Sequence, residues 1–161
     1  MPYNAIAEAA FVFIDKSISK SLLGKMRPIS LEATPLVASA VLWAFKLSGT
    51  AKKFYAVQAG AKETILQKLE KRLRKTDFIH VEARLRKYLK SIENLPGDAD
   101  GDAAISAAAA AIGIEFQNTA VGETDLGIEK AMELFIQTAM ITSEFIEGAI
   151  RRLTGGIGTK L

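Results

Sequence analysis

Residues 34–45 read TPLVASAVLWAF, an uncharged and almost entirely apolar segment. Thr34 suits an N-cap, and Pro35 suits the first helical position, where the missing N–H of proline costs no hydrogen bond. Ser48 and Gly49 predict the end of this helix. Because apolar residues cover nearly every side of it, we expect the helix to lie at the centre of a core.

Helical spacing of apolar residues continues on both sides of this segment. Further helical regions are predicted from about Asn4 to Leu22, from Thr50 towards Leu95, from about Asp102, and from Thr124-Asp125 to Gly155-Gly156. In the long region after Thr50, Gly60 and Thr76-Asp77 are candidate breaks. The Ala-rich region after Asp102 is expected to pack close beside the apolar second helix.

Strand signals are scarce, because no sustained alternation of apolar and polar residues occurs. The predicted fold is therefore all-α: one domain over residues 1–161, a helical bundle of four to five helices with a long basic central helical region. Residues 155–161 are expected to form a flexible C-terminal tail.

Composition narrows the possible functions. The chain contains no Cys, which removes disulfides, thiol nucleophiles and thiolate-bound metals and fits a reducing, cytoplasmic location. Its longest uncharged stretches, residues 33–45 and 103–114, are shorter than the roughly 20 residues that a helix needs to cross a bilayer. Neither a membrane span nor an export signal is expected.

Charge is unevenly distributed along the chain. Residues 46–90 carry thirteen basic and four acidic side chains, a net charge of +9, whereas residues 91–148 carry one basic and eleven acidic side chains, a net charge of −10. Three interpretations remain open. The acidic helices could fold back on the basic ones, the basic region could bind a polyanion, or basic and acidic surfaces of different subunits could meet.

The leading functional hypothesis is a non-enzymatic structural or adaptor protein that forms a homo-oligomer through charge-segregated helix surfaces. Self-association is assigned to Trp43, Phe45, Glu129 and Glu133. The alternative is a non-specific nucleic-acid-binding protein that uses the basic helical region 62–90. The residues assigned to an acidic partner or to nucleic acid are Lys62, Lys68, Lys71, Arg72, Arg74, Lys75, Arg84, Arg86, Lys87 and Lys90.

One acidic loop partly resembles a calcium-binding motif. Asp98, Asp100 and Asp102 fit its first three ligand positions, but Ala103 replaces the glycine of the turn and Ala109 replaces the bidentate glutamate. No metal or other cofactor is therefore predicted, although the three aspartates leave weak cation binding open.

His80 is the only histidine of the chain. A metal site with two histidines from one chain is therefore impossible, and no nucleophile motif accompanies His80. The residue is expected at the surface or in an interface. The carboxylate pair Glu129 and Glu133 lacks the Glu-x-x-His partners of a di-iron bundle, and no enzymatic activity is predicted.

Overall fold

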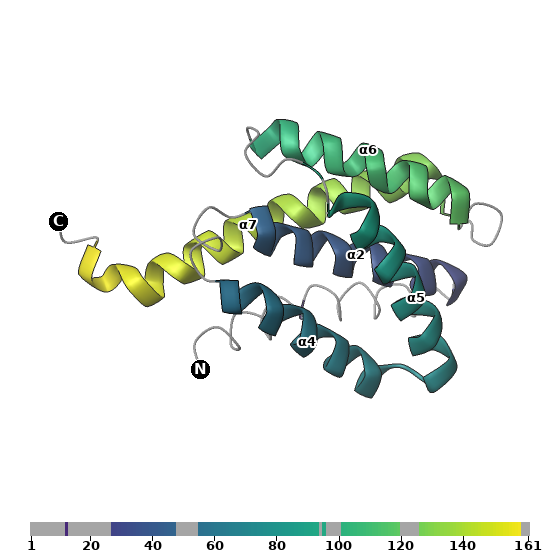
Figure 1. The fold of residues 1–161 in the computed structure, drawn as a ribbon, viewed down its shortest axis with the longest axis horizontal. Coiled ribbons are helices and arrows are strands. Elements are labelled where there is room, and N and C mark those ends of the chain that lie inside the picture. The colour runs from purple at the N-terminus through teal and green to yellow at the C-terminus, as the bar shows by residue number, and fades with distance from the viewer. Residues whose placement is uncertain are drawn as a thin grey trace.

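The computed structural model describes residues 12, 27–47, 55–93, 95, 101–119 and 126–158. Within these ranges the chain forms five helices and no strand (Figure 1), which confirms the all-α prediction. The helix predicted from about Asn4 to Leu22 lies outside the described residues except for Val12.

Helix α2, Arg27–Leu47, begins earlier than the sequence predicts. The assignment of Thr34 as N-cap and Pro35 as first helical residue is wrong, because Pro35 lies inside the helix. Pro28 occupies the first turn, where a missing N–H is tolerated. Tertiary packing offsets the cost of Pro35, since the side chains from Glu32 to Ala44 are buried except for the half-buried Leu42.

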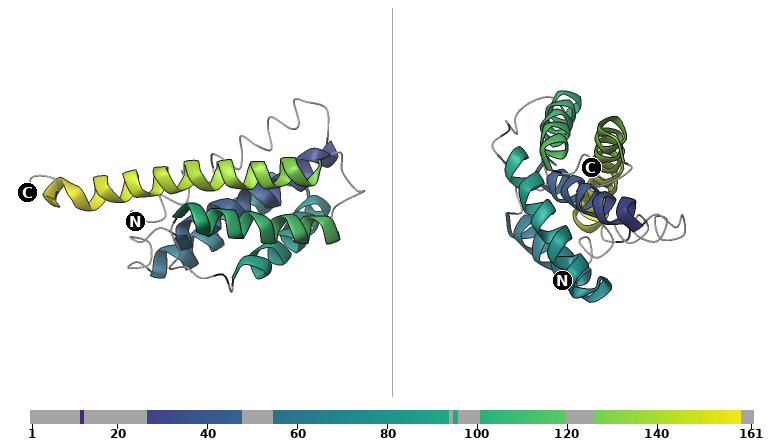
Figure 2. Two further views of the ribbon diagram at one scale, coloured as in Figure 1. Left: turned by 90° about the horizontal axis from the view of Figure 1, so that it is seen from above. Right: turned by 90° about the vertical axis from the view of Figure 1, so that its right-hand side faces the viewer.

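Helix α2 contacts three other helices, which are α4 (Tyr55–Arg72), α5 (Lys75–Ile92) and α7 (Ile128–Gly158). The end-on view in Figure 2 shows α2 in the middle of the bundle, as its apolar sequence predicts. Helix α6 (Gly101–Thr119) packs mainly on α5 and α7. The Ala-rich helix shares a buried apolar cluster with α2, but its main neighbours are α5 and α7.

The long basic region is two helices joined by a sharp corner. Helix α4 ends at Arg72, and Arg74 has an extended backbone with φ −63° and ψ 153° before α5 begins at Lys75. The break thus precedes the predicted Thr76-Asp77, and α4 continues through Gly60. Asp77 instead lies in the first turn of α5, where a negative charge interacts favourably with the helix dipole.

Helix α7 passes through Gly155-Gly156 and ends at Gly158. The predicted stop at the two glycines was wrong, and the part of the expected tail up to Gly158 is helical. The last turns of α7 project beyond the other helices in both Figure 1 and Figure 2.

Two apolar clusters hold the five helices together. In one, Val41 of α2 packs with Ile65 and Leu69 of α4 and with Val81 and Leu85 of α5. The other joins α2, α5, α6 and α7, and its largest fully buried side chains are Leu36, Tyr88, Ile112, Phe116 and Phe135. The apolar residues of the basic region therefore face the core.

Helices α6 and α7 approach closely at Gly113. A Cβ atom placed there would lie 2.8 Å from Met132 Sδ and 3.7 Å from Ile128 Cγ2. Glycine removes the side chain that would otherwise separate the two helices at this position.

Candidate functional site

The clearest polar feature of the core is Glu32 of α2. Its side chain is 3% exposed, and its Oε1 atom lies 2.8 Å from His80 Nε2 and 3.4 Å from Arg84 Nε. Both partners come from α5, where four residues separate them on one face of the helix. A buried carboxylate requires such partners, because an uncompensated charge in the core costs several kcal/mol.

The hydrogen bond assigns the proton on His80. A carboxylate offers only lone pairs, so Nε2 must donate, and in the neutral imidazole the lone pair then lies on Nδ1. The His80 side chain is 36% exposed. His80 thus lies partly at the surface, and it also contacts a buried carboxylate.

Tyr88 lies one turn beyond Arg84 on α5 and is fully buried. Burial raises the pKa of its phenol far above the ordinary value, and the negative charge of Glu32 raises it further. Within the part of the chain that the structure describes, Tyr88 OH and Glu32 Oε2 are buried without a hydrogen-bond partner. Glu32, His80, Arg84 and Tyr88 are called the polar cluster below.

Arg84 was assigned by sequence to a surface that binds anions. The structure places it against Glu32 with a side chain that is only 12% exposed. Arg84 therefore neutralises an internal charge and does not belong to the exposed cationic surface.

The exposed cations gather where α4 meets α5. Lys71, Arg72, Arg74 and Lys75 all lie within five consecutive positions and are exposed; they are called the basic corner below. Of the other predicted cations, Lys62, Arg86, Lys87 and Lys90 are exposed, and Lys68 is half-buried. Arg86 forms an ion pair of 3.4 Å with Glu82, one helical turn earlier.

The exposed side of α7 carries the acidic residues Glu129, Glu133 and Glu144, called the acidic face below. Glu133 accepts a hydrogen bond of 3.1 Å from Gln137 and lies 3.9 Å from Lys130 Nζ. The predicted self-association residues Glu129 and Glu133 are therefore accessible.

Trp43 has a different environment from these two glutamates. It is 6% exposed, and its ring centroid lies 5.9 Å from that of Phe135. Burial within its own chain removes the physical reason for assigning Trp43 to a subunit contact. The side chain of Phe45 lies outside the described residues.

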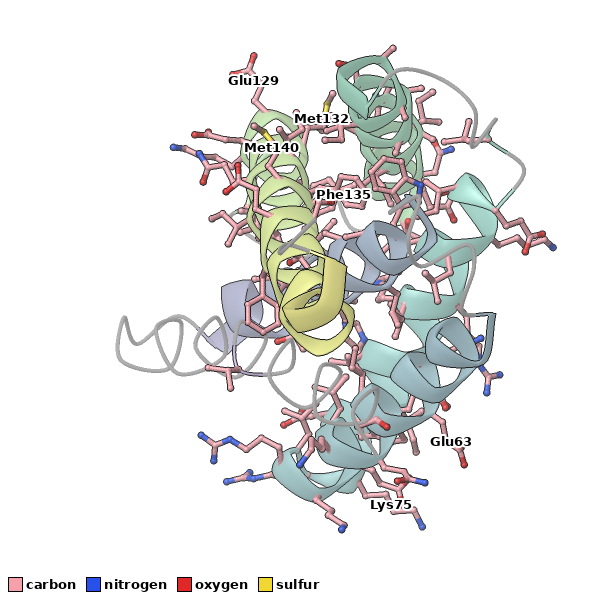
Figure 3. All side chains as sticks on the ribbon, turned by 90° about the vertical axis from the view of Figure 1, so that its left-hand side faces the viewer. Glu63, Lys75, Glu129, Met132, Phe135 and Met140 are labelled. Carbon is pink, nitrogen blue, oxygen red and sulfur yellow. The ribbon has the colours of Figure 1, made fainter. Side chains whose placement is uncertain are left out.

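Figure 3 shows Lys75 of the basic corner and Glu129 of the acidic face on opposite sides of the molecule. The helix contacts agree, because α4 packs on α2 and α5, whereas α7 packs on α2 and α6. Among the described residues, the acidic helix α7 therefore does not fold back on the basic corner. Charge separation along the sequence becomes charge separation in space.

Two further features of the described residues concern a possible ligand pocket and a possible metal site. An open hollow of about 140 Å³ between α2 and α5 is lined by Leu42, Trp43, Leu89, Ile92 and Glu93, and only the last of these carries charge. In the described parts of the chain, no group of three His, Cys, Asp or Glu side chains is placed to hold a metal. The loop with Asp98 and Asp100, and the side chain of Asp102, lie outside those parts.

None of the described helices combines the length and apolarity needed to cross a membrane. Comparison of the chain with protein-family models, with curated proteins and with solved structures found no significant match.

Proposed function

We propose that this chain is a helical structural or adaptor protein that self-assembles head to tail, with the basic corner of one copy meeting the acidic face of the next. The observation that carries the proposal is the position of these two surfaces on opposite sides of α2. Their charges do not neutralise one another within one chain, and complementary potentials favour the approach of a second copy.

Each surface also carries exposed apolar side chains. Ile79, four residues after Lys75, is 55% exposed, and on α7 Met140 and Ile141 are 46% and 52% exposed. Met140 lies on the same side of α7 as Glu129 in Figure 3. Apolar contact between Ile79 and the Met140–Ile141 pair would supply affinity, because exposed ion pairs contribute only about 0 to 1 kcal/mol each.

The proposed contact is heterologous, because it joins two different surfaces of the same chain. Repetition of such a contact closes into a ring or continues as a filament. Charge pairing would mainly set the rate and orientation of association. Raising the salt concentration should therefore slow assembly more than it dissolves assembled particles.

The test is light scattering over a concentration series at about 50 mM and about 500 mM salt, on either side of the range in which screening becomes strong. Replacing Glu129 and Glu133 by Lys should keep the protein at 17.4 kDa under conditions in which the wild type associates. Adding Arg74→Glu and Lys75→Glu to the same chain should partly restore association.

The matched control is Lys87→Glu with Lys90→Glu. This control reverses two basic charges, as Arg74→Glu with Lys75→Glu does at the basic corner. Lys87 lies about 18 Å along the helix from Lys75, so association should persist in the control. A wild-type mass of 17.4 kDa at every concentration in both buffers would refute the proposal. Equal loss of association in the control and in the α7 variant would refute the assigned surfaces.

The second candidate function is non-specific nucleic-acid binding, and the exposure of all four basic-corner residues favours it. Phosphate contacts by such a corner give an affinity that falls steeply with salt and depends little on sequence. Fluorescence anisotropy with two unrelated duplexes at low and high salt tests this candidate. Lack of binding to both duplexes at low salt would exclude it.

A further inference from the structure

His80 combines two properties that a reactive histidine needs. One ring nitrogen, Nε2, is held 2.8 Å from the buried carboxylate of Glu32, while the side chain remains 36% exposed. The hydrogen bond fixes the ring orientation and leaves the lone pair on Nδ1. Carboxylate partners of this kind fix the tautomer and the orientation of metal-ligating histidines.

We propose that His80 is a phosphoryl-acceptor site, with Nδ1 as the nucleophile and Glu32 as the residue that positions the ring. The donor class is an acyl phosphate. Its carboxylate leaving group departs as a stable anion and therefore needs no general acid at the site. The proposal is independent of the proposed self-association.

The transfer forms one bond and breaks one. The Nδ1 lone pair attacks phosphorus, an N–P bond forms, and the P–O bond to the acyl group breaks with its electron pair leaving on the carboxylate. Nε2 keeps its proton throughout. The ring of the product carries a positive charge, which the adjacent Glu32 carboxylate stabilises through the same hydrogen bond.

The charges near His80 suit an anionic donor. Arg84 and Glu32 offset each other within the core, whereas Arg74 and Lys75 are exposed at the start of α5. Asp77, one turn before His80, opposes this attraction, but basic groups outnumber it. A local excess of positive charge raises the concentration of an anionic donor and stabilises the added phosphoryl group.

The experiment is incubation of the folded full-length protein with acetyl phosphate, followed by intact-mass measurement. One phosphoryl group per chain is expected, stable in alkali and lost in acid. His80→Gln should gain none. Glu32→Gln should react about tenfold to 100-fold more slowly, by analogy with the loss when the carboxylate partner of a metal-ligating histidine is removed.

A second measurement tests the role of Glu32 on the wild-type protein alone. The chain contains one histidine, so nitrogen NMR of the ring reports its tautomer without ambiguity. We expect the proton on Nε2 in the wild type and a mixed tautomer in Glu32→Gln. A proton on Nδ1 in the neutral wild-type ring would overturn the proposal, as would an adduct that persists in His80→Gln or the absence of any adduct on the folded wild type.

Discussion

Glu32 and Arg84 should depend on each other far more than on the rest of the core, and a double-mutant cycle can measure this dependence. In the wild type the two side chains are 3% and 12% exposed, with Oε1 and Nε 3.4 Å apart. The cycle consists of Glu32→Leu, Arg84→Met and the double replacement. Each single change removes one partner of a charge in the core.

The structure sets the expected magnitudes. Loss of one partner from a fully buried pair costs about 3 to 5 kcal/mol, whereas replacement of the whole pair by apolar residues is often neutral or stabilising. Because water reaches Arg84 and because His80 also contacts Glu32, each single variant should lose about 2 to 3 kcal/mol. The double variant should lose less than about 1 kcal/mol.

The assay is urea unfolding followed by far-UV circular dichroism, with thermal unfolding as an independent measure. For a chain of this length, a loss of 2 to 3 kcal/mol corresponds to a decrease in Tm of about 4 to 12 °C. The double variant should melt closer to the wild type than either single variant does. An exposed pair provides the control, because Glu82→Gln with Arg86→Met should show a coupling of no more than about 0.5 kcal/mol.

Additive losses would refute this reasoning. If the double variant loses the sum of the two single losses to within about 0.5 kcal/mol, the two groups are energetically independent. The carboxylate of Glu32 would then be compensated by His80 or by water, and Arg84 would contribute through its apolar stem.

Replacements at three other positions test the packing. Tyr88→Phe removes a buried hydroxyl without a hydrogen-bond partner among the described residues, so the free energy of unfolding should stay constant or rise by about 1 kcal/mol. Burial raises the pKa of Tyr88, so the stabilisation that comes from keeping its phenol neutral is lost as pH rises above about 10. Tyr88→Phe should therefore reduce the alkaline fall in stability. Gly113→Ala should change stability by less than about 1 kcal/mol, because better helix propensity offsets the displacement of Met132, whereas Gly113→Leu should cost about 1 to 3 kcal/mol. Trp43→Ala should cost about 3 to 5 kcal/mol without changing the mass in solution, and a loss below 1 kcal/mol in urea unfolding would contradict its burial against Phe135.

Helical periodicity predicted the kind of the described elements well, because spacing of apolar residues reports directly on a buried helix face. It left open whether the basic region is one helix or two, and the structure has two there. The ends of the helices were harder to predict. Two prolines, Pro28 and Pro35, each fit the start of α2, and only tertiary packing decides that Pro35 is tolerated inside the helix. Gly155-Gly156 likewise resembles a stop, yet α7 continues to Gly158.

The polar cluster was missed for the same reason. With a helix start at Thr34, Glu32 lies outside the helix, whereas the observed start at Arg27 places Glu32 one turn before the buried Leu36. The signal on α5 was present in the sequence, because His80, Arg84 and Tyr88 recur every four residues. Spacing within one helix cannot show which residue of another helix it faces, and the pairing with Glu32 required the fold.

The helix order explains why charge separation survives folding. Helices α4 and α5 carry the basic segment and pack on one another, while α6 and α7 contain much of the acidic segment and also form a pair. Helix α2 lies between α4 and α7, so its apolar body occupies the space in which opposite charges could have met. Where the basic and acidic halves do touch, α5 contacts α6, and from residue 103 to residue 119 the only charged side chain of α6 is Glu115. The small and almost uncharged surface of α6 therefore acts as a spacer, and the acidic face of α7 remains exposed.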